Sequence, residues 1–160
     1  MDKISTIEEL KTIVEKARRD GKKIVLADGA FDVFHVGHIR YLEGAKEQGD
    51  ILIVALYGDE AVKSTKGLDR PIVPLEDRVK IVSAMEPVDY VTILHKPAAE
   101  KLILELRPHV VAKGSGPGKD TSPERNIVVS YGGKIAIVGG PKEHSSSAFI
   151  ERISKNVETT

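Results

Sequence analysis

The chain has 160 residues, 41% of them hydrophobic, which suits one domain with a single core and excludes a disordered protein. Lysine and arginine together total 24, as do aspartate and glutamate, so the formal net charge is zero. Nonspecific electrostatic binding to nucleic acid is therefore not expected. The absence of cysteine excludes disulfides, thiolate catalysis and cysteine-ligated zinc.

The sequence shows no targeting or membrane signal. The first twenty residues are studded with charges and lack the apolar stretch of a signal peptide. The longest apolar run, residues 51–57, is too short to span a bilayer. We therefore expect a cytoplasmic protein that has no membrane partner and forms a single domain over residues 1–160.

The predicted elements begin with an amphipathic helix over about residues 5–20, where Ser5 and Glu8 have capping-box spacing and Gly21 follows the end. The patterns then predict, in chain order, a strand at 22–29, a helix at 36–49, a strand at 50–58, a helix at 74–85, a strand at 88–94, a helix at 97–107, a strand at 109–114, a short helix near 123–131, a strand at 133–140 and a last helix at about 145–156.

Continuous apolar strands that alternate with helices predict an α/β fold: a Rossmann-like, doubly wound, mainly parallel five-stranded sheet with helices on both faces. Ligands of such sheets bind at the carboxyl ends of the strands, near the topological switch point. Three unusual segments fall at these ends: GAFDVFHVGH (29–38), KSTKGLDRP (63–71) and KGSGPGKD (113–120).

The histidines of the first segment, His35 and His38, admit three interpretations: loop residues satisfied by the backbone, metal ligands, or donors to a phosphate. A metal site needs a third or fourth ligand, and no paired spacing singles out His95, His109 or His144. The phosphate interpretation accounts for more of the segment, because His38 falls in the first turn of a predicted helix. Free N–H groups and the helix dipole favour an anion there.

Two glycines of the same segment, Gly29 and Gly37, favour the phosphate interpretation, since neither has a side chain that would block close approach of a ligand. Imidazole N–H groups can donate to phosphoryl oxygens as charge builds in a transition state. Lys66 and Arg70, in the loop KGLDRP, add cations on the same side of the sheet. The sequence thus predicts a phosphate site where the first strand meets the next helix.

The segment GAFDVFHVGH resembles the H-x-G-H signature of the cytidylyltransferase-like nucleotidylyltransferases, and the resemblance runs from about residue 22 to 152. It is closest to the adenylyltransferase domain of ADP-heptose synthesis, through FDVFHVGHIRYLEGAKEQGD, KGLDRPIVPLEDR and HVVAKG. The resemblance implies a transferase of lipopolysaccharide biosynthesis that moves AMP from ATP to a sugar 1-phosphate and releases pyrophosphate. The acceptor it implies is D-glycero-β-D-manno-heptose 1-phosphate.

The resemblance also implies roles for individual residues. The expected catalytic residues are His35, His38 and Lys66. The residues expected to bind the nucleotide are Gly29, Ala30, Phe31, Gly37, Arg78, Lys113, Gly114, Ser145, Ser146 and Ser147. The residues expected at the acceptor are Asp32 and Arg70, and Asp32 is expected to orient its loop rather than hold a metal. Mg²⁺ is expected to be bound mainly through nucleotide phosphates, with no protein ligand assigned, and the protein is expected to form a homodimer.

Two segments keep a plainer interpretation. KGSGPGKD is not a Walker A motif, because Lys113 stands where the first glycine is needed and Asp120 where serine or threonine is needed. The part SGPGKD replaces an acidic–aromatic step of the resembled domain, so acceptor choice is expected to depend on this loop. The serines 145–147 suit a helix N-cap as well as a phosphate contact, and the two roles are compatible.

Other functions remain open at this stage. One is a cytidylyltransferase that acts on glycerol 3-phosphate or another alcohol phosphate, since ATP and CTP differ only in base recognition. Nucleotidyl transfer to a flavin or another cofactor precursor is a further possibility. A non-catalytic nucleotide sensor is the alternative from another class, and the intact H-x-G-H argues against it because pure binding does not need both histidines.

Overall fold

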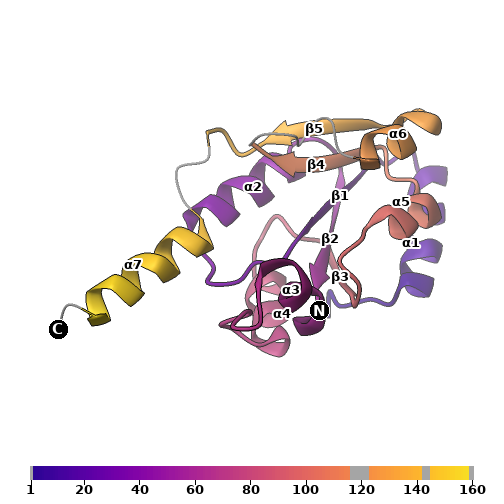
Figure 1. The fold of residues 1–160 in the computed structure, drawn as a ribbon. Coiled ribbons are helices and arrows are strands. Elements are labelled where there is room, and N and C mark those ends of the chain that lie inside the picture. Colours follow the sequence, from indigo (N-terminus) through magenta and orange to yellow (C-terminus); the bar gives the residue numbers. More distant parts are fainter. Residues whose placement is uncertain (1, 116–122, 142–144, 159–160) are drawn as a thin grey trace.

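The computed structural model describes residues 2–115, 123–141 and 145–158 (Figure 1). Within these ranges, a five-stranded parallel sheet has the order β3-β2-β1-β4-β5. Its strands are β1 (Ile24–Gly29), β2 (Ile51–Tyr57), β3 (Tyr90–Leu94), β4 (Val110–Gly114) and β5 (Lys134–Val138). The predicted Rossmann-like α/β fold is confirmed.

Helices connect successive strands, and the first helix precedes the first strand while the last helix follows the last strand. They are α1 (Ile7–Arg19), α2 (Val36–Lys46), α3 (Asp59–Lys66), α4 (Leu75–Ser83), α5 (Glu100–Leu106), α6 (Pro123–Ser130) and α7 (Ser146–Glu158). The first strands of the chain are added toward one edge of the sheet and the later ones toward the other. The order therefore reverses between β1 and β4, and this reversal is the topological switch point.

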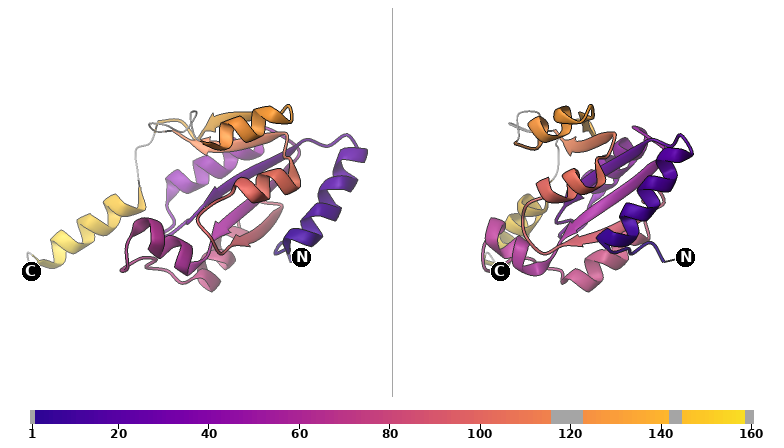
Figure 2. Two further views of the ribbon diagram at one scale, coloured as in Figure 1. Left: turned by 45° about the vertical axis from the view of Figure 1, so that its right-hand side comes forward. Right: turned by 90° about the vertical axis from the view of Figure 1, so that its right-hand side faces the viewer.

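Alternation of side chains along the strands builds a core on each face of the sheet. Val25 and Ala27 of β1 pack with α2 and α4, whereas Ile24 and Leu26 pack with α1, α5 and α6. Because both faces are covered, the strands are apolar at consecutive positions, as the sequence indicated. The helix α7 stands apart from these layers and projects away from the sheet in Figure 1 and in the left view of Figure 2.

The N-cap of the first helix lies one residue later than predicted. Thr6 is the N-cap, and its hydroxyl accepts a hydrogen bond from the Glu9 N–H at 3.1 Å. Ser5 does not cap the helix, because its N–H donates to the Val91 carbonyl in a short extended segment beside β3. The prediction that paired Ser5 with Glu8 was therefore wrong by one position.

The helix α3 has no counterpart among the predicted elements. Its sequence, DEAVKSTK, buries only Ala61 and Val62, so it carries too few apolar residues to show a helical period. Gly58 precedes it and Gly67 ends it with φ of 115°, a conformation that favours glycine. Lys66 is consequently the last residue of a helix and not part of a loop.

The described residues contain no helix with the length and apolar character needed to cross a membrane.

We predict that replacing Ile53, which is 0% exposed in β2, by alanine lowers the free energy of unfolding by about 2–5 kcal/mol, because it leaves a cavity in the close-packed core. Leu68 is 90% exposed and serves as the matched control, for which the same change should cost less than about 0.5 kcal/mol. Urea unfolding monitored by circular dichroism measures both. Equal costs for the two variants would contradict the assigned core.

Candidate active site

A hollow of about 360 Å³ opens at the switch point, at the carboxyl ends of β1 and β4. It is bordered by the loop after β1, the N-termini of α2 and α7, and the glycines that follow β5. The residues predicted from the sequence that line it are Gly29, Ala30, Phe31, Asp32, His35, Gly37, His38, Lys66, Arg70, Gly114, Ser145, Ser146 and Ser147. The structure thus brings most of the predicted site together, and Arg78 and Lys113 lie outside this hollow.

The loop after β1 is held in an unusual conformation. Phe31 and Val33 have φ of 52° and 47°, which is rare for residues other than glycine and especially for a β-branched one. The buried ring of Phe31 folds back on Gly29, where a Cβ atom would lie 2.9 Å from the ring. The ring centroid of Phe31 lies 5.2 Å from that of His38. Gly29 is therefore required for the phenylalanine that supports His38, a reason that the sequence did not reveal.

The two histidines form a capping box at the start of α2. The Nδ1 atom of His35 accepts a hydrogen bond from the Gly37 N–H at 3.1 Å, and the Nδ1 atom of His38 accepts one from the His35 N–H at 3.2 Å. A neutral imidazole that accepts at Nδ1 carries its proton at Nε2. The helix cap therefore sets both rings in the tautomer whose Nε2–H is a hydrogen-bond donor.

Asp32 is the buried anchor of the loop. Its carboxylate accepts hydrogen bonds of 2.9 Å from the N–H groups of Ile72 and Val73 and from Nε of Arg70. The side chains of Asp32 and Arg70 are 1% and 7% exposed. Burial raises the pKa of Asp32, but these three donors outweigh burial and hold the pKa below its usual value of 3.8. Asp32 therefore stays ionised and ties the loop after β1 to the segment between α3 and α4.

Arg70 extends from this ion pair toward the hollow. Its Nη1 atom donates to the hydroxyl of Ser147 at 3.3 Å. Its Nη2 atom is buried and has no hydrogen-bond partner within the described part of the chain. A buried guanidinium donor without a protein acceptor is costly unless a ligand or water satisfies it. Arg70 also lines the hollow, so its guanidinium places a positive charge at this wall.

The first turn of α7 forms another wall. The Ser145 hydroxyl accepts from the Ala148 N–H at 3.1 Å and so caps the helix. The Ser146 hydroxyl donates to the carbonyl groups of Asp32 and Val33, which fastens this helix to the loop after β1. Two helices, α2 and α7, consequently begin at the same hollow, and both direct the positive ends of their dipoles toward it.

The hollow is suited to anions rather than to a protein-held metal. The described residues include no group of three or more histidine, aspartate or glutamate side chains placed to hold a metal ion. The carboxylate of Asp32 is already occupied by three donors. Mg²⁺ carried on phosphate groups, with few ligands from the protein, is compatible with this geometry.

Arg78, expected at a phosphate, is instead 0% exposed and does not line this hollow. Its guanidinium donates to the carbonyl groups of Val73, Ala30 and Tyr57 and to the carboxylate of Asp59, at 2.7–2.9 Å. These protein acceptors enclose it beneath the site. The geometry favours a positioning role for Arg78 over the predicted contact.

Lys113, expected to bind the nucleotide, does not line the main hollow and instead pairs with carboxylates of the protein. Its ammonium group lies 2.9 Å from Asp28 and 2.5 Å from Glu124. Burial lowers the pKa of Lys113, but the two carboxylates outweigh it and the pKa is raised. Burial, followed by the charge of Asp28, raises the pKa of Glu124 despite the nearby lysine.

Several residues at the hollow were not predicted. They are Asp28, Arg40, Tyr41, Ser115, Val138, Gly139, Gly140 and Pro141. Gly139 and Gly140 end the last predicted strand (133–140) and follow the observed β5, so the rule that placed the other strand ends at the site could have found them. Tyr41 lies one helical turn after His38, and its hydroxyl donates to the Ala112 carbonyl at 2.8 Å across the switch point. Most of the loop SGPGKD, and His144, lie outside the described residues.

Comparison with known proteins extends these observations. A cytidylyltransferase-like family model matches residues 26–152. The bifunctional protein HldE of Desulfatibacillum aliphaticivorans is 40% identical over 151 residues, which cover 94% of this chain and 31% of that protein. HldE of Pseudomonas aeruginosa strain LESB58 is 37% identical over 147 residues, covering 92% and 31%. The chain spans about a third of the length of these curated relatives.

Solved structures share the fold. The lipopolysaccharide core biosynthesis protein from Thermoplasma volcanium GSS1 superposes with a TM-score of 0.62 at 27% identity, over 73% of this chain and 94% of that one. A pantoate-beta-alanine ligase from Francisella tularensis superposes with a TM-score of 0.60 over 92% of this chain and 69% of that one. At 15% identity, the second likeness concerns the fold alone.

We predict that Asp32→Asn lowers the free energy of unfolding by about 3 kcal/mol at pH 7, because it leaves the buried Arg70 charge uncompensated. The folded-state pKa of Asp32 is depressed, so its contribution is present above the usual value of 3.8 and is lost as the pH falls through the lower folded value. Urea unfolding of both proteins from pH 7 to pH 3 should show the difference shrinking below about pH 4. A difference that is constant over this range would contradict the ionised anchor.

We predict that Arg78→Lys lowers the free energy of unfolding by about 2 kcal/mol or more, because an ammonium group cannot reproduce the fork of hydrogen bonds to four acceptors. Arg152→Lys on the projecting helix α7 is the matched control and should leave stability unchanged. Thermal unfolding measures both. If Arg78→Lys weakens nucleotide binding without loss of stability, the direct phosphate contact is correct and the bracing role is wrong.

Proposed function

Because this chain belongs to the cytidylyltransferase-like family, and its resemblance to HldE makes it an enzyme of the nucleotidyltransferase class, we propose that it transfers AMP from ATP to a sugar 1-phosphate. The acceptor proposed is D-glycero-β-D-manno-heptose 1-phosphate. Support for ATP and for the heptose comes from the resemblance to the adenylyltransferase domain of ADP-heptose synthesis and from the HldE relatives. A homodimer and a cytoplasmic location remain predictions.

The observation that carries this proposal is the convergence of donors on one hollow. The Nε2–H groups that the capping box sets on His35 and His38, the guanidinium of Arg70, and the first turns of α2 and α7 belong to the same wall. Such an array stabilises negative charge without a general base. A nucleotidyl transfer to a phosphate acceptor has this requirement, because its nucleophile is already an anion.

The proposed step is an in-line displacement at the α-phosphorus of ATP. An oxygen of the acceptor's phosphate forms the new P–O bond, the bond between the α-phosphorus and the bridging oxygen to the β-phosphate breaks, and pyrophosphate leaves with that electron pair. No proton needs to be transferred. We propose that His35 and His38 donate to the α-phosphoryl oxygens, and that Lys66, Arg70 and the serines 145–147 hold the charge of the phosphates. This assignment moves Arg70 from the acceptor, where it was expected, to the phosphates, because its Nη1 donates to the hydroxyl of Ser147. Mg²⁺ carried on the nucleotide neutralises further phosphate charge.

The test is a pyrophosphate-release screen of the purified chain with ATP or CTP against heptose 1-phosphate, hexose 1-phosphates and glycerol 3-phosphate. Release that depends on both ATP and a sugar 1-phosphate is the expected result. Release with CTP and glycerol 3-phosphate would replace the proposal with the cytidylyltransferase alternative. Nucleotide binding without release from any pair would indicate a sensor.

We predict that His38→Ala lowers turnover by about 10²–10³-fold, the usual effect of removing one charge-stabilising donor, with little loss of folding. His35→Asn is a sharper variant, because asparagine is a favoured N-cap and retains the start of α2 while losing the Nε2 donor. Steady-state pyrophosphate release and circular dichroism measure the two effects separately. Near-normal turnover by a folded His35→Ala/His38→Ala protein would refute the role of the motif.

A further inference from the structure

A second hollow, of about 430 Å³, adjoins the first across the end of β1. Asp28, Gly29, Ala30, Tyr41, Lys66 and Gly114 line both hollows. The second hollow extends toward α3 and α6, and neither the histidines nor the serines of α7 line it. Its volume is in the range of sites that take a small molecule.

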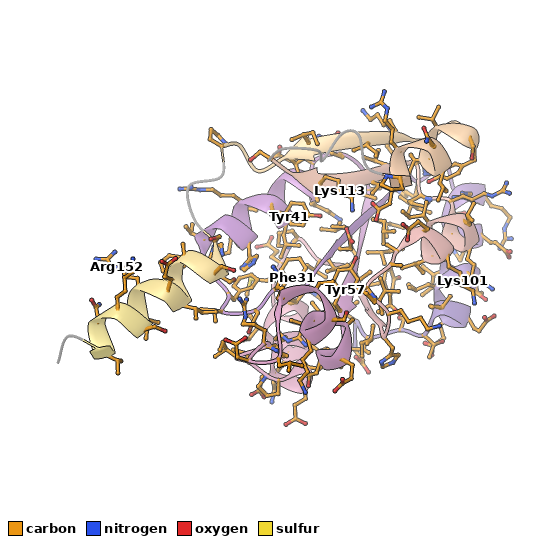
Figure 3. The ribbon with its side chains drawn as sticks, in the orientation of Figure 1. Phe31, Tyr41, Tyr57, Lys101, Lys113 and Arg152 are labelled. Carbon is orange, nitrogen blue, oxygen red and sulfur yellow. The ribbon has the colours of Figure 1, made fainter. Side chains whose placement is uncertain are left out.

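The wall of this second hollow is a hydrogen-bonded cluster of Asp28, Lys113, Glu124 and Tyr57, called here the carboxylate wall. Lys113 lies between the two carboxylates, and the Tyr57 hydroxyl donates to Asp28 at 2.5 Å. The ion-paired side chains are only 9–12% exposed. Figure 3 shows Tyr41, Tyr57 and Lys113 in one central region, with Lys101 and Arg152 on opposite sides of the molecule.

The charges of the carboxylate wall are unlike those of the main hollow. Two carboxylates flank a single ammonium group, so the wall presents more hydrogen-bond acceptors than donors and a net negative charge when both acids are ionised. Such a surface repels a second phosphate group. It accepts hydrogen bonds from hydroxyl groups, and the phenol and proline faces of Tyr57 and Pro97 add apolar contact.

The geometry of displacement connects the two hollows. In an in-line reaction the nucleophile and the leaving group stand on opposite sides of the phosphorus. If the pyrophosphate lies against Arg70 and the serines of α7, the acceptor approaches from the side that faces away from them. The second hollow lies on that side, with Lys66 at the boundary of the two.

Resting on the proposed function, we propose that Asp28 and Glu124 of the carboxylate wall are specificity-determining residues, which bind the hydroxyl groups of the acceptor's sugar and reject acceptors that carry a second phosphate. Lys113 positions the two carboxylates and is not a phosphate ligand. The substrate class is therefore a neutral polyhydroxyl chain with one phosphate. Neither acid was identified from the sequence as a site residue.

The experiment uses calorimetry without turnover on the full chain, with heptose 1-phosphate, mannose 1-phosphate, glucose 1-phosphate and inorganic phosphate as probes. We expect the wild type to bind at least one of the sugar phosphates more tightly than inorganic phosphate. Glu124→Gln should weaken that binding about tenfold, equivalent to losing one hydrogen bond to a charged group, and leave inorganic phosphate and ATP unaffected. Asp28→Asn is a second variant with the same expected selectivity.

Glu60→Gln is the matched control, because it makes the same change on α3 at a side chain that is exposed. A second readout depends on charge: the wild type should bind a hexose 1,6-bisphosphate more weakly than the hexose 1-phosphate, and Glu124→Gln should narrow this ratio. A purely structural role for Glu124 would leave the ratio unchanged. Four outcomes would overturn the proposal. They are an unchanged ratio, an equal loss of affinity for all probes in Glu124→Gln, a loss of affinity confined to ATP, and a wild type that does not prefer a sugar phosphate to inorganic phosphate.

These outcomes are independent of the proposed reaction. Selective binding of sugar phosphates without pyrophosphate release would leave the carboxylate wall as a sugar site and refute the transferase. Release of pyrophosphate with unchanged acceptor affinity in Glu124→Gln would retain the transferase and refute the role of the wall.

Discussion

The buried carboxylate of Asp32 is the interaction on which the site depends. It joins segments that are distant in sequence: the loop after β1, the turn between α3 and α4, and, through Arg70 and Ser147, the start of α7. An isolated carboxylate in this position would be strongly disfavoured. The N–H groups of Ile72 and Val73 and the guanidinium of Arg70 offset that penalty. The ionised carboxylate can therefore stay buried and hold together the segments that form the hollow.

The consequences extend from this junction to the chemistry. With the loop after β1 fixed, Phe31 lies against Gly29 and supports the ring of His38. The buried guanidinium of Arg78 holds the same loop through a hydrogen bond to the carbonyl of Ala30. The site is therefore a set of rigid connections between strand ends, and the groups that face the hollow are oriented by contacts behind them. Preorganisation of this kind makes hydrogen-bond donors effective toward developing charge.

The sequence predicted the architecture and the composition of the site better than the roles within it. Continuous apolar strands and the H-x-G-H segment are local patterns, and they indicated the sheet, its ligand edge and the histidines. Arg78 was misplaced because whether a cation reaches solvent or is enclosed depends on the fold around it. That Glu124 of α6 lines the second hollow was not predicted, because its partners Asp28 of β1 and Lys113 of β4 lie on separate strands and no spacing connects the three residues. The helix α3 was missed since its apolar residues are too few to show a period.

The capping box at α2 has a further consequence. The bonds that cap the first turn of α2 are the bonds that select the tautomer of both histidines, so the start of the helix and the orientation of the imidazole donors depend on the same contacts. A folded molecule with α2 formed and the imidazoles in the other tautomer would have to leave the first turn uncapped. A ligand that meets the two Nε2–H groups in this orientation would require no rearrangement of either ring.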